Sequence, residues 1–492
     1  MTKTSTDQAR TAPGAVTDAA RTRWIALAFV GLAQLMLQFN SNVVVIALPS
    51  AQQSLSIPDS MRAWVLGIYS LAFGGMLMAG GRIVDRFGRK RTMVLAMAGF
   101  VIASAVGGAA QTTMMLIIAL AAQGVFAAVQ NPAQLATITT TFTDPAERGK
   151  AFSYFGLINT AGGTIGFLLS GVITDSLGWR WCLFLSVPLG LIAMIGAMLV
   201  LKEGPAGERK PFDVPGAVLV TASMLALAYG LSEAGKHGWG DGTTVGLLIG
   251  GLVLLIVFIV LQTKVKHPLM PMRVLLDRNR GGANLVMLLI SMQILSMNFF
   301  LTYFAQNIKH FTPAETGLTF LPLTAGLLVT NSVVGKIAAR FRPRSFVLVG
   351  MLVYALAYVW LTQVSAEDSY WSSFLPAMVV MGLGIGCMVA PVYSTATAGV
   401  DPGDAGAAGG IVGTGRQMGA ALGLALSNTI ATLVTSSFLE AHPGDEQARV
   451  TATVHGFNVA AAWAAGLLVF GAIVGFLLMN APKPEPGKAG HH

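Results

Sequence analysis

Charged residues are scarce in this sequence. Only 11% of its 492 residues are Asp, Glu, Lys or Arg, whereas a typical soluble domain has about 25%. Hydrophobic residues make up 54% of the chain, and its mean hydropathy is +0.67. Because so few charged side chains do not cover a surface exposed to water, the composition excludes a soluble globular protein and predicts a polytopic membrane protein.

Cysteine and targeting signals are also lacking. The two cysteines, Cys182 and Cys387, both lie in apolar runs, where a free thiol packs as a small hydrophobic group, so no disulfide framework is predicted. Residues 1–22 are polar and do not contain a short apolar stretch followed by a small-residue cleavage site. We therefore expect no cleaved signal peptide.

Three kinds of chemistry have no motif in the sequence. No Gly-Lys pair is followed by Ser or Thr, as a phosphate-binding loop requires, so an ATP-driven pump is not predicted. There is no HExxH motif and no cluster of potential ligands, so we predict no metal site, no cofactor and no enzyme activity. The net charge of +9 comes from basic residues in short turns rather than from one patch with aromatic residues, so nucleic acid is not an expected partner.

Long apolar runs dominate what is present. A helix of about 20 apolar residues crosses the roughly 30 Å hydrocarbon core of a bilayer, and the sequence contains fourteen runs of about this length, which predicts fourteen transmembrane helices. The runs lie near residues 24–48, 62–81, 93–110, 114–135, 151–174, 181–201, 215–233, 244–262, 284–307, 315–335, 345–363, 374–396, 408–436 and 456–480.

The basic residues are distributed unevenly between the loops. With both ends of the chain on one side, 25 of the 31 Lys and Arg residues fall on that side and five on the other, and Arg416 is left inside a span. Lys and Arg near span ends resist translocation, so the basic side is expected to be cytoplasmic. We therefore predict a multi-pass protein of the cell membrane (the inner or plasma membrane) with cytoplasmic termini.

The basic segment after the second span has a counterpart after the tenth span. GGRIVDRFGRKR at residues 80–91 corresponds to GKIAARFRPR at residues 335–344. If these segments are equivalent, spans 1–6 pair with spans 9–14, and spans 7 and 8 are inserted between them. The expected fold is an all-α polytopic membrane protein with 14 transmembrane helices: two six-helix bundles related by a pseudo-twofold axis, plus the two inserted helices.

This pairing predicts the regions of the chain. They are a cytoplasmic tail at 1–22, an N-terminal bundle at 23–205, the inserted spans at 206–265, a C-terminal bundle at 266–481 and a cytoplasmic tail at 482–492. We interpret the last two residues, His491 and His492, as a tag remnant.

Five segments carry a family resemblance that covers nearly the whole chain. They are the loop residues Gly81, Asp85, Arg86, Gly88, Arg89 and Lys90, and the segments LGWRWCLFLSVPLG (177–190), YGLSEAGKHGWG (229–240), HPLMPMRVL (267–275) and GTGRQMGAALG (413–423). The sequence thus resembles the major facilitator superfamily, in particular its fourteen-transmembrane-helix branch of drug/proton antiporters. The resemblance implies a secondary active transporter, working as a monomer among membrane lipids, that exports small amphipathic drug-like or antibiotic-like molecules by alternating access, with protons as the candidate coupling ion.

Several positions depart from the pattern of this family. Its members usually carry an Asp in span 1 where this chain has Asn40, and an Arg in span 4 where it has Leu120. The two losses are consistent, because removing one partner of a buried ion pair strands the other charge at a cost of about 3–5 kcal/mol. In span 5 the family's Gly-Pro-x-x-Gly-Gly reads GFLLSG at 166–171, with Phe167 in place of the proline.

Proton coupling usually needs a carboxylate within the membrane, and no predicted span has one near its middle. Glu233, at the outer end of span 7, is therefore the candidate coupling residue. Two alternatives stay open: Glu233 is an ordinary acid at the water boundary, or coupling does not use a carboxylate. A lipid flippase and an uncoupled facilitator of the same fold are the alternative functions.

Uncharged polar residues within the spans are the candidate substrate contacts. Polar amides in hydrocarbon are costly unless they are satisfied, so they should face the protein interior. The candidates come from spans 1, 4, 5 and 9 and are Gln34, Gln38, Asn40, Asn42, Gln123, Asn159, Gln293, Asn298 and Tyr303. For each one the competing interpretation is a hydrogen bond between helices. Because no acid lies among them, we expect neutral or weakly anionic substrates.

Arg416 is the one charge deep within a predicted span, and such residues are functional candidates because burying a charge is costly. It lies on a helix on which Gly415, Gly419 and Gly423 are spaced by four residues, as in closely packed helices. Two interpretations stay open. Arg416 contacts an anionic group of the substrate, or it donates to carbonyl groups and braces the C-terminal bundle.

The segment GGRIVDRFGRKR is the candidate gate. The family resemblance implies that its acid and bases latch the inner face in the outward-open state, and this assigns gating to Gly81, Asp85, Arg86, Gly88 and Arg89. The second copy has Ala339 where the first has Asp85, so the predicted latch is one-sided. The alternative is that this loop only fixes the topology.

Overall fold

A computed structural model of the chain describes residues 13–201, 203, 213–266, 268–338, 340–400, 405–442 and 446–480. In this part of the chain fourteen helices are long and apolar enough to cross a membrane, so the predicted number of spans is confirmed. Residues 1–12 and 482–492 of the predicted tails, and Ala339, lie outside the described residues.

The first six spans are formed by seven helices, since the sixth span is divided between α6 and α7. These helices are α1 (Pro13–Leu55), α2 (Arg62–Phe87), α3 (Arg89–Gly108), α4 (Thr113–Thr141), α5 (Pro145–Ser176), α6 (Trp179–Phe184) and α7 (Ser186–Val200). The two inserted spans are α8 (Val214–His237) and α9 (Gly242–Lys264).

The last six spans follow a short helix, α10 (Met272–Leu275). Their helices are α11 (Arg278–Tyr303), α12 (Pro313–Leu318), α13 (Leu321–Ile337), α14 (Pro343–Leu361), α15 (Leu375–Thr397), α16 (Ala405–Ala441) and α17 (Glu446–Leu478). α12 and α13 together form span 10, and α11 and α15 are each extended by a π-helical turn.

Side-chain caps set where several of these helices begin. The Asp144 carboxylate accepts a hydrogen bond from the Glu147 backbone amide, so α5 starts well before its apolar run. Thr312 and Glu315 form a reciprocal capping box at the start of α12. The helices are therefore longer than the apolar runs suggested, because hydropathy does not register a polar first turn.

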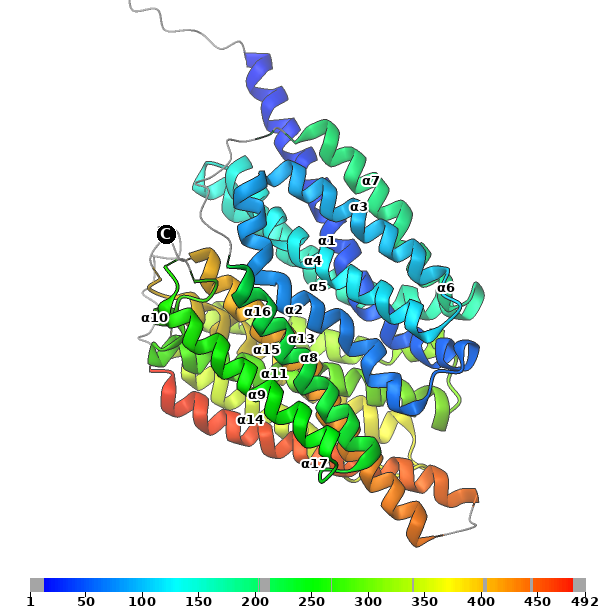
Figure 1. The fold of residues 1–492 in the computed structure, drawn as a ribbon. Coiled ribbons are helices and arrows are strands. Elements are labelled where there is room, and N and C mark those ends of the chain that lie inside the picture. Colours follow the sequence, from blue (N-terminus) through cyan, green and yellow to red (C-terminus); the bar gives the residue numbers. More distant parts are fainter. Residues whose placement is uncertain are drawn as a thin grey trace, which may run out of the picture.

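The helices form two bundles, one from α1–α7 and one from α11–α17, which lie beside each other in Figure 1. We call inner those helix ends that lie with the basic loop between α2 and α3, and outer the opposite ends. The bundles meet where α2 packs on α16, where α1 meets α11, and where α5 packs on α12. The outer ends of α16 and α17 project beyond the other helices (Figure 1).

The α5–α12 contact closes the outer side tightly. A Cβ atom on Gly317 would lie 2.6 Å from the Phe167 carbonyl oxygen, so the two backbones touch. The rings of Phe167 and Phe320 stack with their centroids 4.2 Å apart. Phe167, which replaces the family's proline, is thus part of the packing between the bundles.

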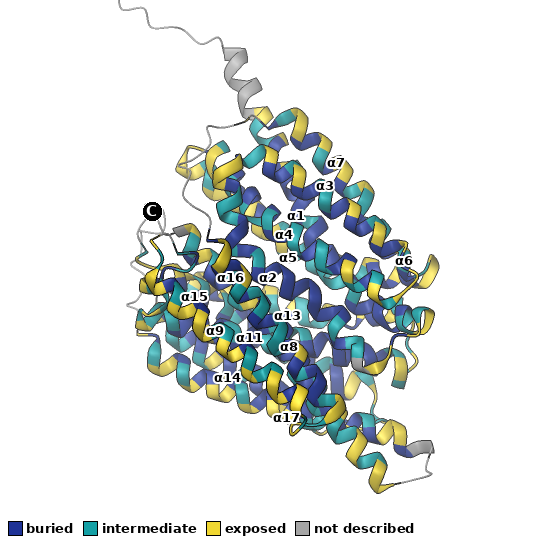
Figure 2. Cartoon of the chain, viewed as in Figure 1, coloured by how far each residue is buried: buried dark blue, intermediate teal, exposed yellow. Residues whose placement is uncertain are grey.

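The two inserted helices differ in their packing. α8 packs against α9, against α16 of the C-terminal bundle and against α2 of the N-terminal bundle (Figure 1). α9 packs mainly on α8, and much of its surface is exposed and apolar (Figure 2). α8 is therefore built into the contact between the bundles, whereas α9 presents an apolar surface suited to lipid.

Candidate functional site

Asn40 and Gln123 form a buried hydrogen-bonded chain in the N-terminal bundle. The Asn40 Nδ2 donates to the Gln123 Oε1 at 3.0 Å, and the Gln123 Nε2 donates to the Ser104 Oγ at 2.9 Å. The Ser104 hydroxyl donates to the Phe100 carbonyl oxygen. This neutral chain links α1, α4 and α3, and it begins at Asn40, where the family resemblance implies an Asp. Both amides are buried, at 1% and 0% exposure, so here they join helices.

A second polar group lies between α1 and α5 and reaches an open surface. The Gln34 Nε2 donates to the Asn159 Oδ1 at 2.9 Å, and the Gln38 Nε2 donates to the Asn159 carbonyl oxygen at 3.3 Å. Asn42 donates to the carbonyl oxygens of Gln38 and Gly163. Asn159 is exposed, and Gln38 and Asn42 are half-buried, although all three lie far from the helix ends. These three residues are therefore at least partly accessible within the membrane-spanning region.

The candidates on α11 fall into two places. Gln293 and Asn298 are buried, at 1% and 8% exposure, and the Tyr358 hydroxyl donates to the Gln293 carbonyl oxygen. No described hydrogen bond joins either side chain to the amides of the N-terminal bundle. The substrate contacts that the sequence predicts therefore do not all lie together at one point.

Tyr303 lies at the outer contact between the bundles. Its hydroxyl donates to the Gln52 Oε1 at 2.6 Å, and the Arg62 guanidinium lies 4.6 Å above its ring. Gln306 adds a second bridge by donating to the Ile46 carbonyl oxygen. Sequence analysis did not select Gln52, Arg62 or Gln306, because each lies near a span end, where polar residues are ordinary.

Arg416 has an exposed side chain in the first third of α16, toward its inner end. One flank of the helix packs on α11, with Gly419 and Gly423 against its backbone, and another packs on α2, where the Thr414 hydroxyl donates to the Gly74 carbonyl oxygen. Among the described residues Arg416 makes no hydrogen bond or ion pair. Its guanidinium is therefore accessible to a ligand, and with the described residues it does not make the carbonyl contacts of the bracing interpretation.

The loop GGRIVDRFGRKR is anchored by its bases, not by its acid. The Lys90 Nζ donates to the Met198 carbonyl oxygen at 2.7 Å, and Arg91 pairs with Glu203 at 3.3 Å. Arg82 donates to the Pro268 carbonyl oxygen, in the segment that follows α9. Asp85 is exposed and has no hydrogen bond or ion pair with a described residue.

The glycines of this loop have different surroundings. Gly88 lies between α2 and α3 with φ of +86°, a conformation that favours glycine, and a Cβ there would lie 2.8 Å from the Glu203 Oε1. A Cβ on Gly81 would meet nothing within 4 Å. Arg86 lies over the ring of Phe87, and Arg89 begins α3. The loop thus requires a glycine at 88 but has room for a side chain at 81.

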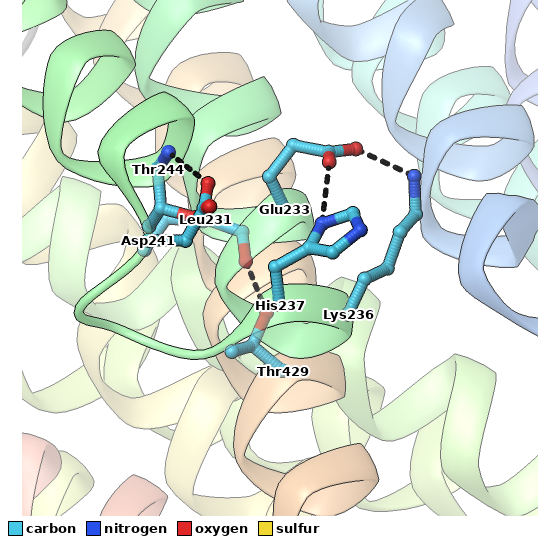
Figure 3. Close-up of polar contacts among 7 residues, drawn as sticks. All are labelled: Leu231, Glu233, Lys236, His237, Asp241, Thr244 and Thr429. Carbon is cyan, nitrogen blue, oxygen red and sulfur yellow. Dashed lines mark hydrogen bonds and ion pairs between the residues drawn. The ribbon is translucent and has the colours of Figure 1, made fainter.

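Glu233 is held by two bases at the outer end of α8 (Figure 3). Its carboxylate lies 2.5 Å from the Lys236 Nζ and 3.1 Å from the His237 Nδ1, and the residue is 6% exposed. Just beyond the helix, the Thr244 backbone amide hydrogen-bonds to Asp241 and lowers the pKa of that carboxyl. Glu233 is therefore an ion-paired acid with little exposed surface, four residues from the outer end of α8.

Taken together, fourteen spanning helices in two bundles, with accessible amides and a guanidinium within the spans, define a polytopic membrane transporter. The family model described as Major Facilitator Superfamily matches residues 30–424 and 284–491. The chain belongs to this superfamily, and to its branch of drug and antibiotic efflux transporters with fourteen helices.

Curated relatives match the chain along most of its length. The puromycin resistance protein pur8 of Streptomyces alboniger is 41% identical over 471 residues, which cover 95% of this chain and 93% of the relative. The cephamycin export protein CmcT of Amycolatopsis lactamdurans is 35% identical, covering 85% and 88%. The lincomycin resistance protein of Streptomyces lincolnensis is 31% identical, covering 82% and 84%.

Solved structures share the fold at low sequence identity. An auto-inhibited peptide transporter of the POT family has a TM-score of 0.67 at 17% identity, and the match covers 94% of this chain and 98% of that one. A bacterial homologue of the human lysosomal transporter Spinster has a TM-score of 0.64 at 16% identity, covering 93% and 97%.

Proposed function

We propose that this protein exports small amphipathic organic compounds of the drug or antibiotic kind, neutral or weakly anionic, across the cell membrane. One observation carries the proposal: Gln38, Asn159 and Arg416 are accessible within the spans, and they supply amide groups and one positive charge. Export and resistance proteins for puromycin, cephamycin and lincomycin among the relatives support the substrate class.

Alternating access is supported by the uneven contact between the bundles. At the outer side Tyr303 meets Gln52, and Phe167 stacks on Phe320. Toward the inner side Asn159 on α5 and Asn331 on α13 are exposed. This arrangement suits a conformation that is closed outside and open inside. We propose that the inner side faces the cytoplasm, as the basic loops indicate, and that the transporter works as a monomer.

For coupling, we propose proton antiport with Glu233 as the proton-binding group. Glu233 is the buried carboxylate within a described span, and the His237 Nδ1 lies 3.1 Å from it. Uncoupled facilitation is the second candidate, and the neutral Asn40–Gln123 chain favours it, because that chain contains no group that titrates.

Reconstituted transport separates these candidates. Purified protein in proteoliposomes is given puromycin and an imposed pH gradient of either sign, and the same is done with Glu233→Gln and with Glu440→Gln, an exposed acid near the outer end of α16. We expect gradient-driven accumulation in the parent and in Glu440→Gln, but only equilibration in Glu233→Gln. Full accumulation in Glu233→Gln would reject Glu233, equilibration in all three would identify a facilitator, and no transport of a wider panel would reject the proposed function.

A further inference from the structure

The two bundles meet along two seams, one where α2 faces α16 and one where α5 faces α12 and α13. The two seams differ in the segments that cover them. We propose that amphipathic substrates pass from the inner leaflet to the accessible groups of the candidate site, Asn159 and Arg416 among them, through the α5–α13 seam alone, because the inserted helices seal the α2–α16 seam. This inference rests on the proposed function and specifies the route its substrates take.

α8 covers the α2–α16 seam from its outer end inward. At the outer end the Thr429 hydroxyl of α16 donates to the Leu231 carbonyl oxygen at 2.6 Å, and the rings of Trp64 and Tyr229 lie 5.6 Å apart (Figure 3 shows the first contact). Further inward, a Cβ on Gly75 of α2 would lie 2.6 Å from the Thr221 Oγ1. α8 therefore touches the helices on both sides of this seam.

The segment after α9, residues 268–276, covers the inner end of the same seam, and we call it the strap. On one side Leu269 is buried with Ala79 of α2, and the Pro268 carbonyl oxygen accepts a hydrogen bond from Arg82 at 3.0 Å. On the other side Val274 is buried against Ala408, on α16. The strap therefore bridges the two bundles at the inner side, near the first residues of α8.

The strap is fixed to the inserted helices by buried hydrogen bonds. The Gln262 Nε2 of α9 donates to the Asp213 Oδ2 at 2.6 Å, and the Gln262 Oε1 accepts from the Met270 backbone amide at 2.9 Å. Asp213 in turn caps α8 by accepting from the Gly216 amide. A lipid or substrate molecule that entered through this seam would have to break these contacts.

No described segment covers the α5–α13 seam in this way. One face of α5 can be followed at helical spacing from its outer to its inner end. Its exposure changes steadily, from buried Gly171 and Phe167 through half-buried Thr164 and Thr160 to exposed Gly156, Ser153 and Gly149. The face that packs on α12 outside thus becomes uncovered inside, where its residues are small or polar rather than the large apolar residues of α9.

The partner helices show the same gradient. Gly317 of α12 is buried against α5, Thr324 of α13 is half-buried, and Leu328, Asn331 and Gly335 are exposed. A helix face that met only lipid tails would not be expected to carry an asparagine. Both faces are thus exposed toward their inner ends and carry polar groups. On the proposed route they frame an opening to the lipid, which suits a molecule with an apolar body and a polar end.

Fluorescence quenching tests which seam lipid can reach. A small thiol-reactive fluorophore is attached to Asn331→Cys or Gly156→Cys in protein that carries Cys182→Ala and Cys387→Ala, in nanodiscs. The matched position on the sealed seam is Gly410→Cys, which lies about as far from its inner helix end as Asn331 and has the Met78 side chain 3.6 Å away. Gly246→Cys on α9, with nothing within 4 Å, reports full lipid exposure.

Acyl-brominated phospholipid is the membrane quencher and iodide is the aqueous quencher. We expect bromolipid to quench the fluorophore at 331 and 156 at least half as strongly as at 246, and at 410 at least threefold more weakly. Equal quenching at 331 and 410 would overturn the proposal. So would quenching at 331 by iodide alone, because the opening would then lead only to water.

Binding kinetics test whether substrate uses this route. The probe is Nile red, a neutral dye that partitions into bilayers, and its association rate is measured in nanodiscs, where binding does not require the outer side to open. A bulky maleimide on Asn331→Cys should slow association at least tenfold, whereas the same group on Gly410→Cys should not. An unchanged rate at 331 would overturn the route. If Nile red and puromycin both fail to bind the parent, the proposed function falls, while the quenching pattern still decides the seam.

Discussion

Asn40 shows how a neutral side chain serves at a position where a charge is expected. An amide both donates and accepts, so Asn40 can bind Gln123 while Gln123 continues to Ser104, and the chain ends on a backbone carbonyl. Leu120, where the family carries an arginine, is fully buried among apolar residues. The bundle thereby avoids the desolvation of two charges and keeps three helices in register.

Gln134 leads to a prediction about stability. It is 0% exposed, and neither polar atom of its side chain has a hydrogen-bond partner among the described residues. An unsatisfied buried amide costs about 1–3 kcal/mol, so Gln134→Met, which keeps the length without the polar end, should raise the melting temperature of the purified protein. Gln123→Met is the control and should lower it, since it removes two hydrogen bonds. A lower melting temperature for Gln134→Met would mean that its amide is satisfied, for example by water.

Arg416 leads to a prediction about selectivity. Because its guanidinium is exposed and unpaired among the described residues, Arg416→Gln should leave the melting temperature unchanged. A hydrogen bond to a charged group contributes about 1.5–3 kcal/mol, so the variant should bind a carboxylate-bearing compound roughly 10- to 100-fold more weakly, and its methyl ester equally well. Binding of both compounds is measured by titration, with Arg449→Gln as the control. Loss of folding in Arg416→Gln would instead support the bracing interpretation.

At the scale of helices, the approach of α16 to α11 depends on glycine. A Cβ on Gly419 or Gly423 would collide with the backbone of Leu288 or Met292. This agrees with the four-residue spacing in the sequence, which is typical of closely packed membrane helices.

Gly423→Ala should therefore destabilise the protein by about 1–3 kcal/mol, because the added methyl group overpacks the interface. Gly246→Ala is the matched control, since nothing lies within 4 Å of its Cβ and alanine favours a helix. Thermal unfolding of both variants in the same detergent provides the comparison. Equal melting temperatures would show that α16 and α11 can move apart without cost.

The inserted helices show what helix-scale prediction leaves open. Hydropathy predicted the positions of spans 7 and 8 and makes span 8 the more apolar of the two. Packing shows what each helix contacts: Tyr229 and Thr221 of α8 reach α2, while α9 is apolar and exposed on most of its surface. The high hydropathy of span 8 fits its exposed surface, but no local pattern indicates the partners of α8, because these partners are residues far away in the chain.

At the scale of the whole molecule, Asp85 is the residue to test. It is exposed and unpaired among the described residues in a conformation whose outer side is closed. If it latches the inner side in the opposite conformation, Asp85→Asn should slow turnover at least tenfold and leave substrate affinity and melting temperature unchanged.

Transport and binding are measured on the same proteoliposome preparation of Asp85→Asn. Asp175→Asn, an exposed acid at the outer end of α5, is the control and should transport like the parent. Normal turnover in correctly inserted Asp85→Asn would leave the loop with its topological role alone.

The candidate site was predicted in parts. The sequence indicated which amides and which arginine lie within the spans, because polar residues stand out against an apolar background. It could not indicate that Asn159 and Arg416 are exposed while Asn40, Gln123 and Gln293 are buried. A rotation of a helix by a fraction of a turn exchanges these environments, and that rotation is set by the neighbouring helices.

The sequence by itself determined the fourteen spans, the repeat of six helices with two inserted, and the loss of the charged pair in spans 1 and 4. These follow from hydropathy, charge and residue identity, which act locally along the chain. The tertiary structure alone decided that the outer ends of α5 and α12 meet while the inner faces stay exposed, and that α8 covers one seam and leaves the other open. Those properties arise from contacts between distant segments, and they depend on which face of each helix meets which neighbour.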